Sequence, residues 1–538
     1  MQSPEKKENI KEREFLLALG RRVFSNLTKE FEDYTALKLD AQRRTLIAQE
    51  MHLIEQEYFS GLDKAYFLAR ESFEKGRVNK ARMRYHNPQM DEKLNELSGN
   101  LINSAGIFVI GGLMFDEHNA GVKNIFGLER NEGAVIDVLG SATSLSLGAH
   151  NPYTLIFDRI EDALKVRDNI CIAYHPGVRQ AFFLNKIAAL YPTPSKVPVA
   201  VHSEASGTIA ASVSIEAALA FFEKRSQNTD AKILAVDGTW AGGHGIAREA
   251  TGFGVSSIGT QRTKKAFYAD RCLPEPTKEN REAFLEILRK KTADGSAAGL
   301  YIEPDIIGDS GIALVDPDLL RETLSILKQH ELPVIADCVQ QIGRTGSYWG
   351  ENVDNILKGY PYLILMTSKS ASNGHPFGYT IIPREIADCV RPVSHVTTNQ
   401  FNGPLLRSIA VAEIFSDSEF QSWLRVKSAK IEEVAAKYNL PLSERGLRGK
   451  FMNRGIYVGS NENVKLAQVA LLVEDGILAG ALPQSLRYQP MLMDYSSTNE
   501  LVAEVIFRRV SEVAKGNVSS YVKEIYERMQ GLSSGLAR

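Results

Sequence analysis

The sequence predicts an α/β protein with a mostly parallel central sheet and helices on both faces of that sheet. Between about residues 165 and 415, short apolar runs alternate with segments of helical periodicity. The chain before this region is rich in the good helix formers Glu, Lys, Leu and Ala, and the chain after it mixes both kinds of segment without regular alternation. A repeated strand–helix–strand order is typical of parallel sheets, so the centre of the chain is the expected α/β domain.

The length and composition are those of a globular protein with more than one core. The chain has 538 residues, of which 63 are Lys or Arg and 65 are Asp or Glu, so the net charge is −2. This balance argues against electrostatic attraction to nucleic acid or to a membrane surface, and no apolar run reaches the roughly 20 residues of a membrane helix. The four cysteines are scattered without a CxxC pair, and the charged N-terminus lacks the apolar core of a signal peptide. We therefore expect a soluble, cytoplasmic protein.

We expect four parts along the chain. Residues 1–105 form a helical N-terminal extension, which docks on the main body or on a partner subunit. Residues 106–165 form a segment that packs with the small domain, and residues 166–415 form the large α/β domain. Residues 416–538 form a smaller α+β domain at the C-terminus.

Individual helices also have start signals. Asp316 is a plausible N-cap, and Pro317 takes the first helical position of "DPDLLRETLSILKQH". Near the C-terminus, Ser497 and Glu500 have the spacing of a capping box, which predicts a long helix that ends near Gly516.

Chemically useful residues follow the apolar runs of the centre. In open α/β sheets, ligands bind outside the carboxyl ends of the strands, so these positions are the candidate site. The runs are "VPVAV", "ILAV", "GLYI", "PVIA" and "YLILM", and the residues that follow them are Ser206, Gly207 and Thr208, then Trp240, Glu303, Asp337 and Lys369.

Each of these residues also has an ordinary structural explanation. A small-residue turn at a helix start is a common N-cap, a tryptophan is more often core, an aspartate caps turns, and a lysine is usually exposed. Together, however, they offer helix-start N–H groups for a phosphate, a flat aromatic ring, a carboxylate and a lysine. Pyridoxal phosphate needs this set, because a lysine forms a Schiff base with its aldehyde and an aspartate pairs with its pyridine nitrogen. The opposite charge of Asp337 would favour the protonated nitrogen.

The chain resembles the class III (ω-) aminotransferases, a family of fold-type I pyridoxal phosphate-dependent enzymes, from about residue 130 to 515. The most specific likeness is "DCVQQIGRTGSYW", which resembles the family pattern D-E-V-Q-x-G-x-G-R-T-G. Further similar segments follow in consistent order: "SGTIAASVSIEAALAFF", "YIEPDIIGDSGI", "TSKSASNGHPFG", "TTNQFNGPLL" and "SLRYQPML". The resemblance implies the fold-type I architecture, with a large domain that binds the cofactor.

The resemblance implies a role for each matching residue at the cofactor ring. Lys369 would be the Schiff-base lysine and would carry a proton between the substrate carbon and the cofactor carbon. Asp337 would bind the pyridine nitrogen, and Gln340 would lie near the phenolic oxygen of the ring. Trp240 would stack on the ring, where the family usually has Tyr or Phe.

The resemblance also implies how phosphate and substrate are held. Ser206, Gly207 and Thr208 would hold the phosphate, helped by Thr398 (or Thr397) from the partner subunit. Active sites shared in this way imply a homodimer. Arg487 would receive the carboxylate of an amino-acid or oxo-acid substrate in a bidentate pair.

Several positions depart from the family pattern. Cys338 stands where the family has Glu, Ala241 stands where a His usually follows the aromatic residue, and "QFNGP" replaces F-x-G-N-P. The N-terminal extension is also longer than usual. These departures mark a divergent member that keeps the cofactor residues.

The expected function is pyridoxal phosphate-dependent transamination by a ping-pong mechanism. An amine or amino acid would donate the amino group, and an oxo acid or aldehyde would accept it. The first alternative keeps the cofactor but changes the reaction to that of a racemase or epimerase, an aminomutase or a decarboxylase. The second is a Rossmann-type oxidoreductase, but no G-x-G-x-x-G follows an early strand with an acidic residue about 20 positions later.

Overall fold

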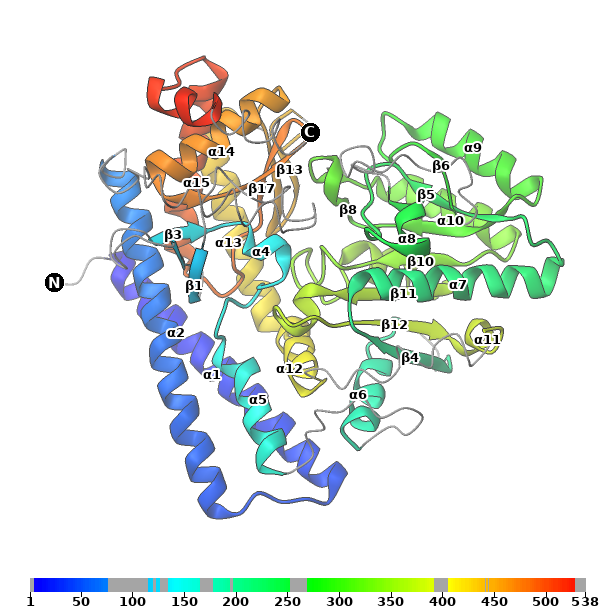
Figure 1. Cartoon of the computed structure of the whole chain (residues 1–538), viewed down its shortest axis with the longest axis horizontal. Helices are drawn as coiled ribbons and strands as arrows, with labels where there is room; N and C mark the ends of the chain where they lie inside the picture. Colours follow the sequence, from blue (N-terminus) through cyan, green and yellow to red (C-terminus); the bar gives the residue numbers. More distant parts are fainter. Residues whose placement is uncertain are drawn as a thin grey trace, which may run out of the picture.

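The structure is a computed structural model, and a seven-stranded sheet forms the core of its larger part (Figure 1). The described residues are 4–75, 115–119, 122–125, 134–164, 178–193, 197–251, 269–390, 405–440, 442–443 and 445–527. The strand order is β4-β12-β11-β10-β7-β5-β6, and only β12 runs antiparallel to its neighbours. The strands are β4 (Val199–Glu204), β5 (Lys232–Val236), β6 (Ala269–Leu273), β7 (Ala297–Ile302), β10 (Val334–Asp337), β11 (Leu363–Ser368) and β12 (Gly378–Pro383).

Helices cover both faces of this sheet. Because side chains alternate along a strand, neighbouring residues of β5 join different apolar clusters. Leu234 belongs to the cluster that contains Leu327 of α10, whereas Ile233 belongs to the cluster that contains Ala217 of α7. The predicted fold class, a mostly parallel sheet between two helical layers, is confirmed. The helices are α6 (Val178–Ala188), α7 (Gly207–Ser226), α8 (Gly245–Ala250), α9 (Arg281–Ala293), α10 (Pro317–Gln329) and α11 (Arg384–Ala387).

The second part of the molecule combines an antiparallel sheet with three long helices. The sheet order is β13-β14-β17-β16. Its strands are β13 (Leu447–Lys450), β14 (Asn453–Tyr457), β16 (Gly480–Leu482) and β17 (Ser485–Tyr488), and its helices are α13 (Ser418–Lys437), α14 (Asn461–Asp475) and α15 (Ser496–Ala514). The short strands β8 (Ile306–Ile307) and β9 (Ala313–Leu314) pair with each other.

Residues before the large sheet join this second part. In a further sheet, β3 (Ala134–Asp137) pairs in parallel with β15 (Ile477–Leu478), and β2 (Val122–Ile125) links β3 to β1 (Phe115–Asn119). After β3 come the short α4 (Gly140–Thr143) and the longer α5 (Pro152–Ala163).

The N-terminal residues form two long antiparallel helices that pack on the body of their own chain. These are α1 (Pro4–Thr35) and α2 (Ala41–Lys75), and they contact α5, α12 (Leu405–Ser416) and α15 (Figure 1). The contact is close enough to require a glycine inside α1. A Cβ atom on Gly20 would lie 2.2 Å from the ring of Tyr153.

Two of the predicted helix starts have different outcomes. The Asp316 cap is confirmed, since its carboxylate accepts the N–H groups of Asp318 and Leu319 at 3.1 and 2.8 Å.

The capping box of Ser497 and Glu500 is wrong, because α15 already begins at Ser496. The N–H of Ser496 is instead accepted at 2.8 Å by Glu12 of α1. A cap from the other end of the chain leaves no local sequence signal. The predicted end of this helix near Gly516 is confirmed, since α15 ends at Ala514.

No helix in the described parts of the chain is both long and apolar enough to cross a bilayer.

Candidate active site

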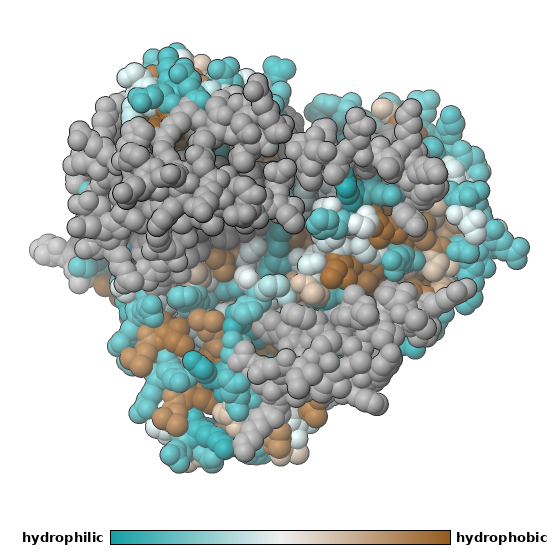
Figure 2. Space-filling view, viewed as in Figure 1, coloured by the Kyte–Doolittle hydropathy of each residue, from teal (hydrophilic) through white to brown (hydrophobic). Residues whose placement is uncertain are grey.

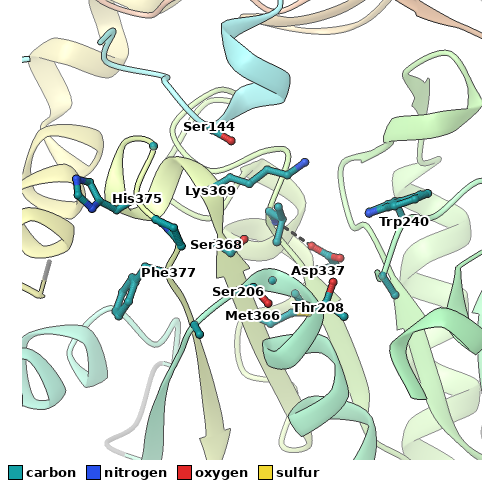
Figure 3. A pocket seen from close by; sticks show the side chains of 16 residues that line it. Ser144, Ser206, Thr208, Trp240, Asp337, Met366, Ser368, Lys369, His375 and Phe377 are labelled. Atoms are coloured by element: carbon teal, nitrogen blue, oxygen red, sulfur yellow. Dashed lines mark hydrogen bonds between the residues drawn. The ribbon is translucent and has the colours of Figure 1, made fainter. Parts of the chain in front are cut away.

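A cavity of about 310 Å³ opens at the carboxyl ends of β10 and β11 (Figure 3). Six of the residues selected from the sequence line it together: Ser206, Gly207, Thr208, Trp240, Asp337 and Lys369. Gln340 and Arg487 lie outside the lining set. Thr397 and Thr398 fall outside the described residues. The volume is in the range of small-molecule sites.

Asp337 is the last residue of β10, and its carboxylate is held by two donors. The N–H of Val339 donates to Oδ1 at 2.9 Å, and the hydroxyl of Tyr301 donates to Oδ2 at 2.5 Å. Burial raises the pKa of Asp337 to about 6, although these two bonds and the charge of Lys369 act in the opposite direction. The carboxylate therefore faces the cavity in a fixed orientation, and a positive partner would favour its charged form.

Lys369 directly follows β11, the strand next to β10, and begins the 3₁₀ turn Lys369–Ser372. Its side chain and that of Asp337 border the same space, with Trp240 across from them (Figure 3). Burial lowers the pKa of Lys369, and the positive charge of Arg487 lowers it further. The backbone φ of Lys369 is +51°, a left-handed conformation that costs on the order of 1 kcal/mol for a residue with a side chain.

The phosphate end of the candidate site is the start of α7. Ser206 is the N-cap, and its hydroxyl accepts the N–H of Ile209 at 3.4 Å. The first N–H groups of a helix have no partner within the helix, and with Ile209 capped by Ser206 those of Gly207 and Thr208 remain for an anion. Gly207 lets this turn approach β11, because a Cβ atom there would lie 2.6 Å from the hydroxyl oxygen of Ser368.

Trp240 is held through its backbone by a buried carboxylate. Glu303, at the end of β7, accepts the N–H of Trp240 at 3.0 Å and that of Gly308 at 2.6 Å. Burial, together with the nearby charges of Asp337 and Asp309, raises the pKa of Glu303. Glu303 thus fixes the loop that brings the indole to the cavity.

Arg487, on β17, approaches from the second part of the molecule. Its Nη2 donates to Oδ1 of Asp309 at 2.7 Å, and both side chains are largely buried. The guanidinium is near enough to the lysine to influence its pKa. Gln340 is also buried, and its Oε1 has no hydrogen-bond partner within the described part of the chain. A ligand could use that amide.

Some residues of the site were not selected from the sequence. Tyr301 lies inside β7 and is paired in register with Ile335, two residues before Asp337. Its only sequence signal is a polar hydroxyl within an apolar run. Ser144 and His375 also line the cavity, but neither has a local motif that sets it apart.

The departures from the family pattern at Cys338 and Ala241 do not remove any of these contacts, and "QFNGP" falls outside the described residues. Cys338 is fully buried, and burial raises the pKa of its thiol, so the group stays protonated and serves packing. Ala241 lines the cavity beside Trp240.

Comparison with known proteins agrees with this geometry. A sequence model of the family described as Aminotransferase class-III matches residues 122–506. An acetylornithine aminotransferase of Methanocaldococcus jannaschii is 28% identical over 248 residues, which are 43% of this chain and 57% of that protein. The acetylornithine aminotransferase of Methanopyrus kandleri is 27% identical over 180 residues, which are 33% of this chain and 44% of that protein. The matched region thus spans about half the length of these curated relatives.

Solved structures share the fold over more of the chain. The ornithine aminotransferase of Toxoplasma gondii superimposes with a TM-score of 0.65 at 16% identity and covers 81% of this chain and 97% of its own. The PMP-bound form of an aminotransferase from Vibrio fluvialis superimposes with a TM-score of 0.63 at 14% identity and covers 76% of this chain and 94% of its own. At these identities the likeness concerns the fold.

Proposed function

The chain belongs to the class III aminotransferase family, and from this membership and the Lys369 cavity we propose that it is a pyridoxal phosphate-dependent aminotransferase. The observation that carries the proposal is the placement of Lys369 and Asp337 on adjacent parallel strands, with both side chains at one cavity onto which the start of α7 also opens.

The residues of the cavity fit this cofactor. Asp337 offers a carboxylate for the pyridine nitrogen, and Trp240 offers a flat ring. Ser206, Gly207 and Thr208 offer the start of a 20-residue helix, whose partial positive charge suits a phosphate. Gln340 lies outside the lining of the cavity, and its unpartnered amide oxygen is a buried acceptor three residues beyond the end of β10.

Lys369 is the group that would handle the proton. When bound, pyridoxal phosphate withdraws electrons from the amino carbon of a substrate, which allows that carbon to lose a proton. The lowered pKa of Lys369 leaves more of its Nζ in the neutral form near neutral pH, and a neutral amine can accept a proton and return it. Asp337 stays in place through its bonds to Tyr301 and Val339.

The proposed substrates are an amino donor, either an amine or an amino acid, and an oxo-acid or aldehyde acceptor. The names of the relatives suggest ornithine and N-acetylornithine as the first donors to test. Arg487 would bind a substrate carboxylate; its Nη2 already donates to Asp309, so the substrate would share the guanidinium with Asp309 or displace it.

We further propose that the protein is a cytoplasmic homodimer with shared active sites. The family resemblance of the Thr397–Thr398 loop supports the shared site. Figure 2 shows apolar patches over the region of the N-terminal helices. In α2, the side chains of Leu46, Leu53 and Phe67 are 53, 64 and 63% exposed. Such surfaces are often covered by a second subunit. The scattered cysteines, of which Cys338 is buried as a free thiol, support a reducing compartment.

Transamination is favoured over the alternative reactions. The relatives reported above are all named aminotransferases, which supports amino transfer over racemisation, amino migration or decarboxylation. The family match, together with the cavity that Lys369 and Asp337 share, leaves no support for a dinucleotide-dependent oxidoreductase.

The decisive experiment is a visible absorbance spectrum of the purified protein with added pyridoxal phosphate. We expect a band of the protein-bound cofactor that an active donor bleaches and that an oxo-acid acceptor restores. Lys369→Ala and Lys369→Arg should both lack the band; the arginine variant is the matched control, because it keeps the positive charge but has no amine that can condense with the aldehyde. A wild-type protein that binds no cofactor would overturn the proposal. A band that persists with Lys369→Arg would contradict the role of the lysine.

A further inference from the structure

The turn that carries Lys369 is held at both ends by residues 143–148. Lys369 and Asn373 both adopt left-handed backbone conformations, with φ of +51° and +47°. The hydroxyl of Ser370 donates to the carbonyl of Thr143. Asn373 accepts the N–H of Leu147 at 3.0 Å and donates to the carbonyl of Gly148 at 2.9 Å. A left-handed residue persists only where its surroundings hold it, and here the 143–148 segment does so.

The same segment is anchored on its other side by the N-terminal helices. The hydroxyl of Tyr58, in α2, donates to the carbonyl of Leu147. Asn151 donates to that carbonyl as well, at 3.2 Å. Tyr58 is fully buried, and a Cβ atom on Gly148 would lie only 3.2 Å from its ring. Leu147 is thus bonded through its carbonyl oxygen to Tyr58 of α2 and through its own N–H to Asn373 of the lysine turn.

The 143–148 segment is also part of the cavity wall. Ser144 lines the cavity close to Lys369 (Figure 3). Leu145 packs on Gly374 so closely that a Cβ atom there would lie 2.5 Å from it. A shift of the segment would therefore change both the wall of the cavity and the support of the lysine.

From these contacts we propose that Tyr58 is a positioning residue for Lys369, and that the N-terminal helices are a working part of the active site. The inference deepens the proposed function and depends on the role of Lys369 stated there. α2 lies outside the residues that match the family model, 122–506, so the match itself does not account for this support. The hydroxyl acts through Leu147 and Asn373 and touches no reacting atom.

The first test compares Tyr58→Phe with Tyr153→Phe. Tyr153 is a matched control, since it is also fully buried at the contact of α2 with α5 and donates its hydroxyl to Glu55 of α2 at 3.2 Å. The Tyr153 bond does not lead to the lysine turn. We expect Tyr58→Phe to lower kcat on the order of tenfold and to leave KM nearly unchanged, because a displaced lysine affects the proton transfer more than the binding. Tyr153→Phe should keep kcat within about twofold, since its hydroxyl is not connected to the reacting groups.

The second measurement needs neither cofactor nor turnover. Hydrogen–deuterium exchange of the cofactor-free protein should be faster in Tyr58→Phe at residues 143–148 and 369–375, and unchanged there in Tyr153→Phe. If the wild type shows no transaminase activity, the proposed function fails while this exchange experiment still decides whether Tyr58 supports the turn. Equal exchange and equal kcat in the two variants would overturn the positioning role. Faster exchange without any loss of kcat would overturn its relevance to the reaction.

Discussion

Asp337 is the residue whose electrostatics depend most on what occupies the cavity. Its carboxylate is buried at the end of a strand and accepts bonds from Tyr301 and Val339. Burial keeps its pKa raised to about 6, even with these bonds and the nearby charge of Lys369. A cationic ring nitrogen would supply the missing positive charge and favour the ionised form. A ligand with a positive charge at this point would therefore be bound more tightly than a neutral one.

We predict that Asp337→Asn stabilises the cofactor-free protein, and more so at higher pH. The pKa of this carboxyl group is near 6 in the folded protein and near 4 in the unfolded chain, so its ionisation destabilises the folded protein. This loss of stability is absent below the unfolded pKa and is complete once the pH has risen through the folded pKa. The variant has no such loss. Its advantage in free energy of unfolding should therefore grow by about 1 kcal/mol or more between about pH 5 and about pH 8. Thermal unfolding of both proteins at these pH values measures it.

Adding pyridoxal phosphate should favour the wild type over Asp337→Asn in thermal stability. The wild type is expected to gain more thermal stability from the cofactor than Asp337→Asn gains, because only the wild type offers a charged partner to the ring nitrogen. A stability difference that does not change with pH would show that Asp337 is already ionised without penalty. An equal gain from the cofactor would remove Asp337 from the proposed site.

At single-residue resolution, the sequence predicts the site only where residues follow apolar runs. Lys369 and Asp337 could be selected because the carboxyl ends of parallel strands meet at one edge of a sheet. Tyr301 could not, since its role depends on the register between β7 and β10, which local patterns leave open. Ser144 comes from an irregular segment whose position is set by packing of distant parts of the chain.

Among the elements, strands and self-capped helices were predictable, whereas strand order and remote caps were not. Every apolar run selected in the centre forms a strand. The strands β5, β7, β10 and β11 are buried on both faces of the sheet, whereas β4 is partly exposed at its edge. The reversed direction of β12 follows from how its chain returns after the Lys369 turn. The start of α15 depends on Glu12, a residue 484 positions away from the N–H that it accepts.

We predict that Glu12→Ala lowers the free energy of unfolding by about 2 kcal/mol. The carboxylate accepts bonds from the N–H of Ser496 and from the indole of Trp423. It also opposes the lowering of the pKa of buried Lys427, which burial brings to about 8. Losing Glu12 leaves the start of α15 without its acceptor and removes one of the negative charges that favour the buried ammonium of Lys427. Chemical denaturation of wild type and variant gives the difference.

The control for this prediction is Glu14→Ala. Glu14 lies on the same helix but is exposed, so its removal should change the free energy of unfolding by less than about 0.5 kcal/mol. If both variants unfold at the same denaturant concentration, α1 does not cap α15 in solution.

For the whole molecule, the N-terminal helices belong to the main core. Their buried side chains join the apolar cluster that also contains residues of α5, α12 and α15. The sequence predicted helices here and left open whether they dock on the body or on a partner subunit. Amphipathic periodicity shows that a helix has an apolar face, but it does not identify the surface that covers this face. The surface that covers the apolar face is identified only by contacts in the folded structure, such as that between Gly20 and Tyr153.

We predict that deletion of residues 1–75 prevents folding and does not yield a smaller enzyme. Burying one large apolar side chain contributes about 1.5–3 kcal/mol, and a domain is stable by only about 5–15 kcal/mol in total. The deletion removes several such side chains, each at most 1% exposed: Leu16, Leu19, Leu27, Phe31, Tyr58, Phe59 and Leu62. It also exposes their apolar partners on α5 and α15 to water. The truncated chain should therefore be insoluble, or lack a cooperative thermal transition.

A shorter deletion separates this effect from a general intolerance of N-terminal change. Removing residues 1–7 takes away side chains that are exposed where the structure describes them, so the melting temperature should stay close to that of the full chain. A 76–538 chain that is soluble, melts like the full-length protein and binds pyridoxal phosphate equally well would show that α1 and α2 are an accessory. It would also remove the physical basis for a link from Tyr58 to Lys369, because the lysine turn would then keep its geometry without α2. An unfolded 76–538 chain beside an intact 8–538 chain would place these helices within the folding unit that forms the active site.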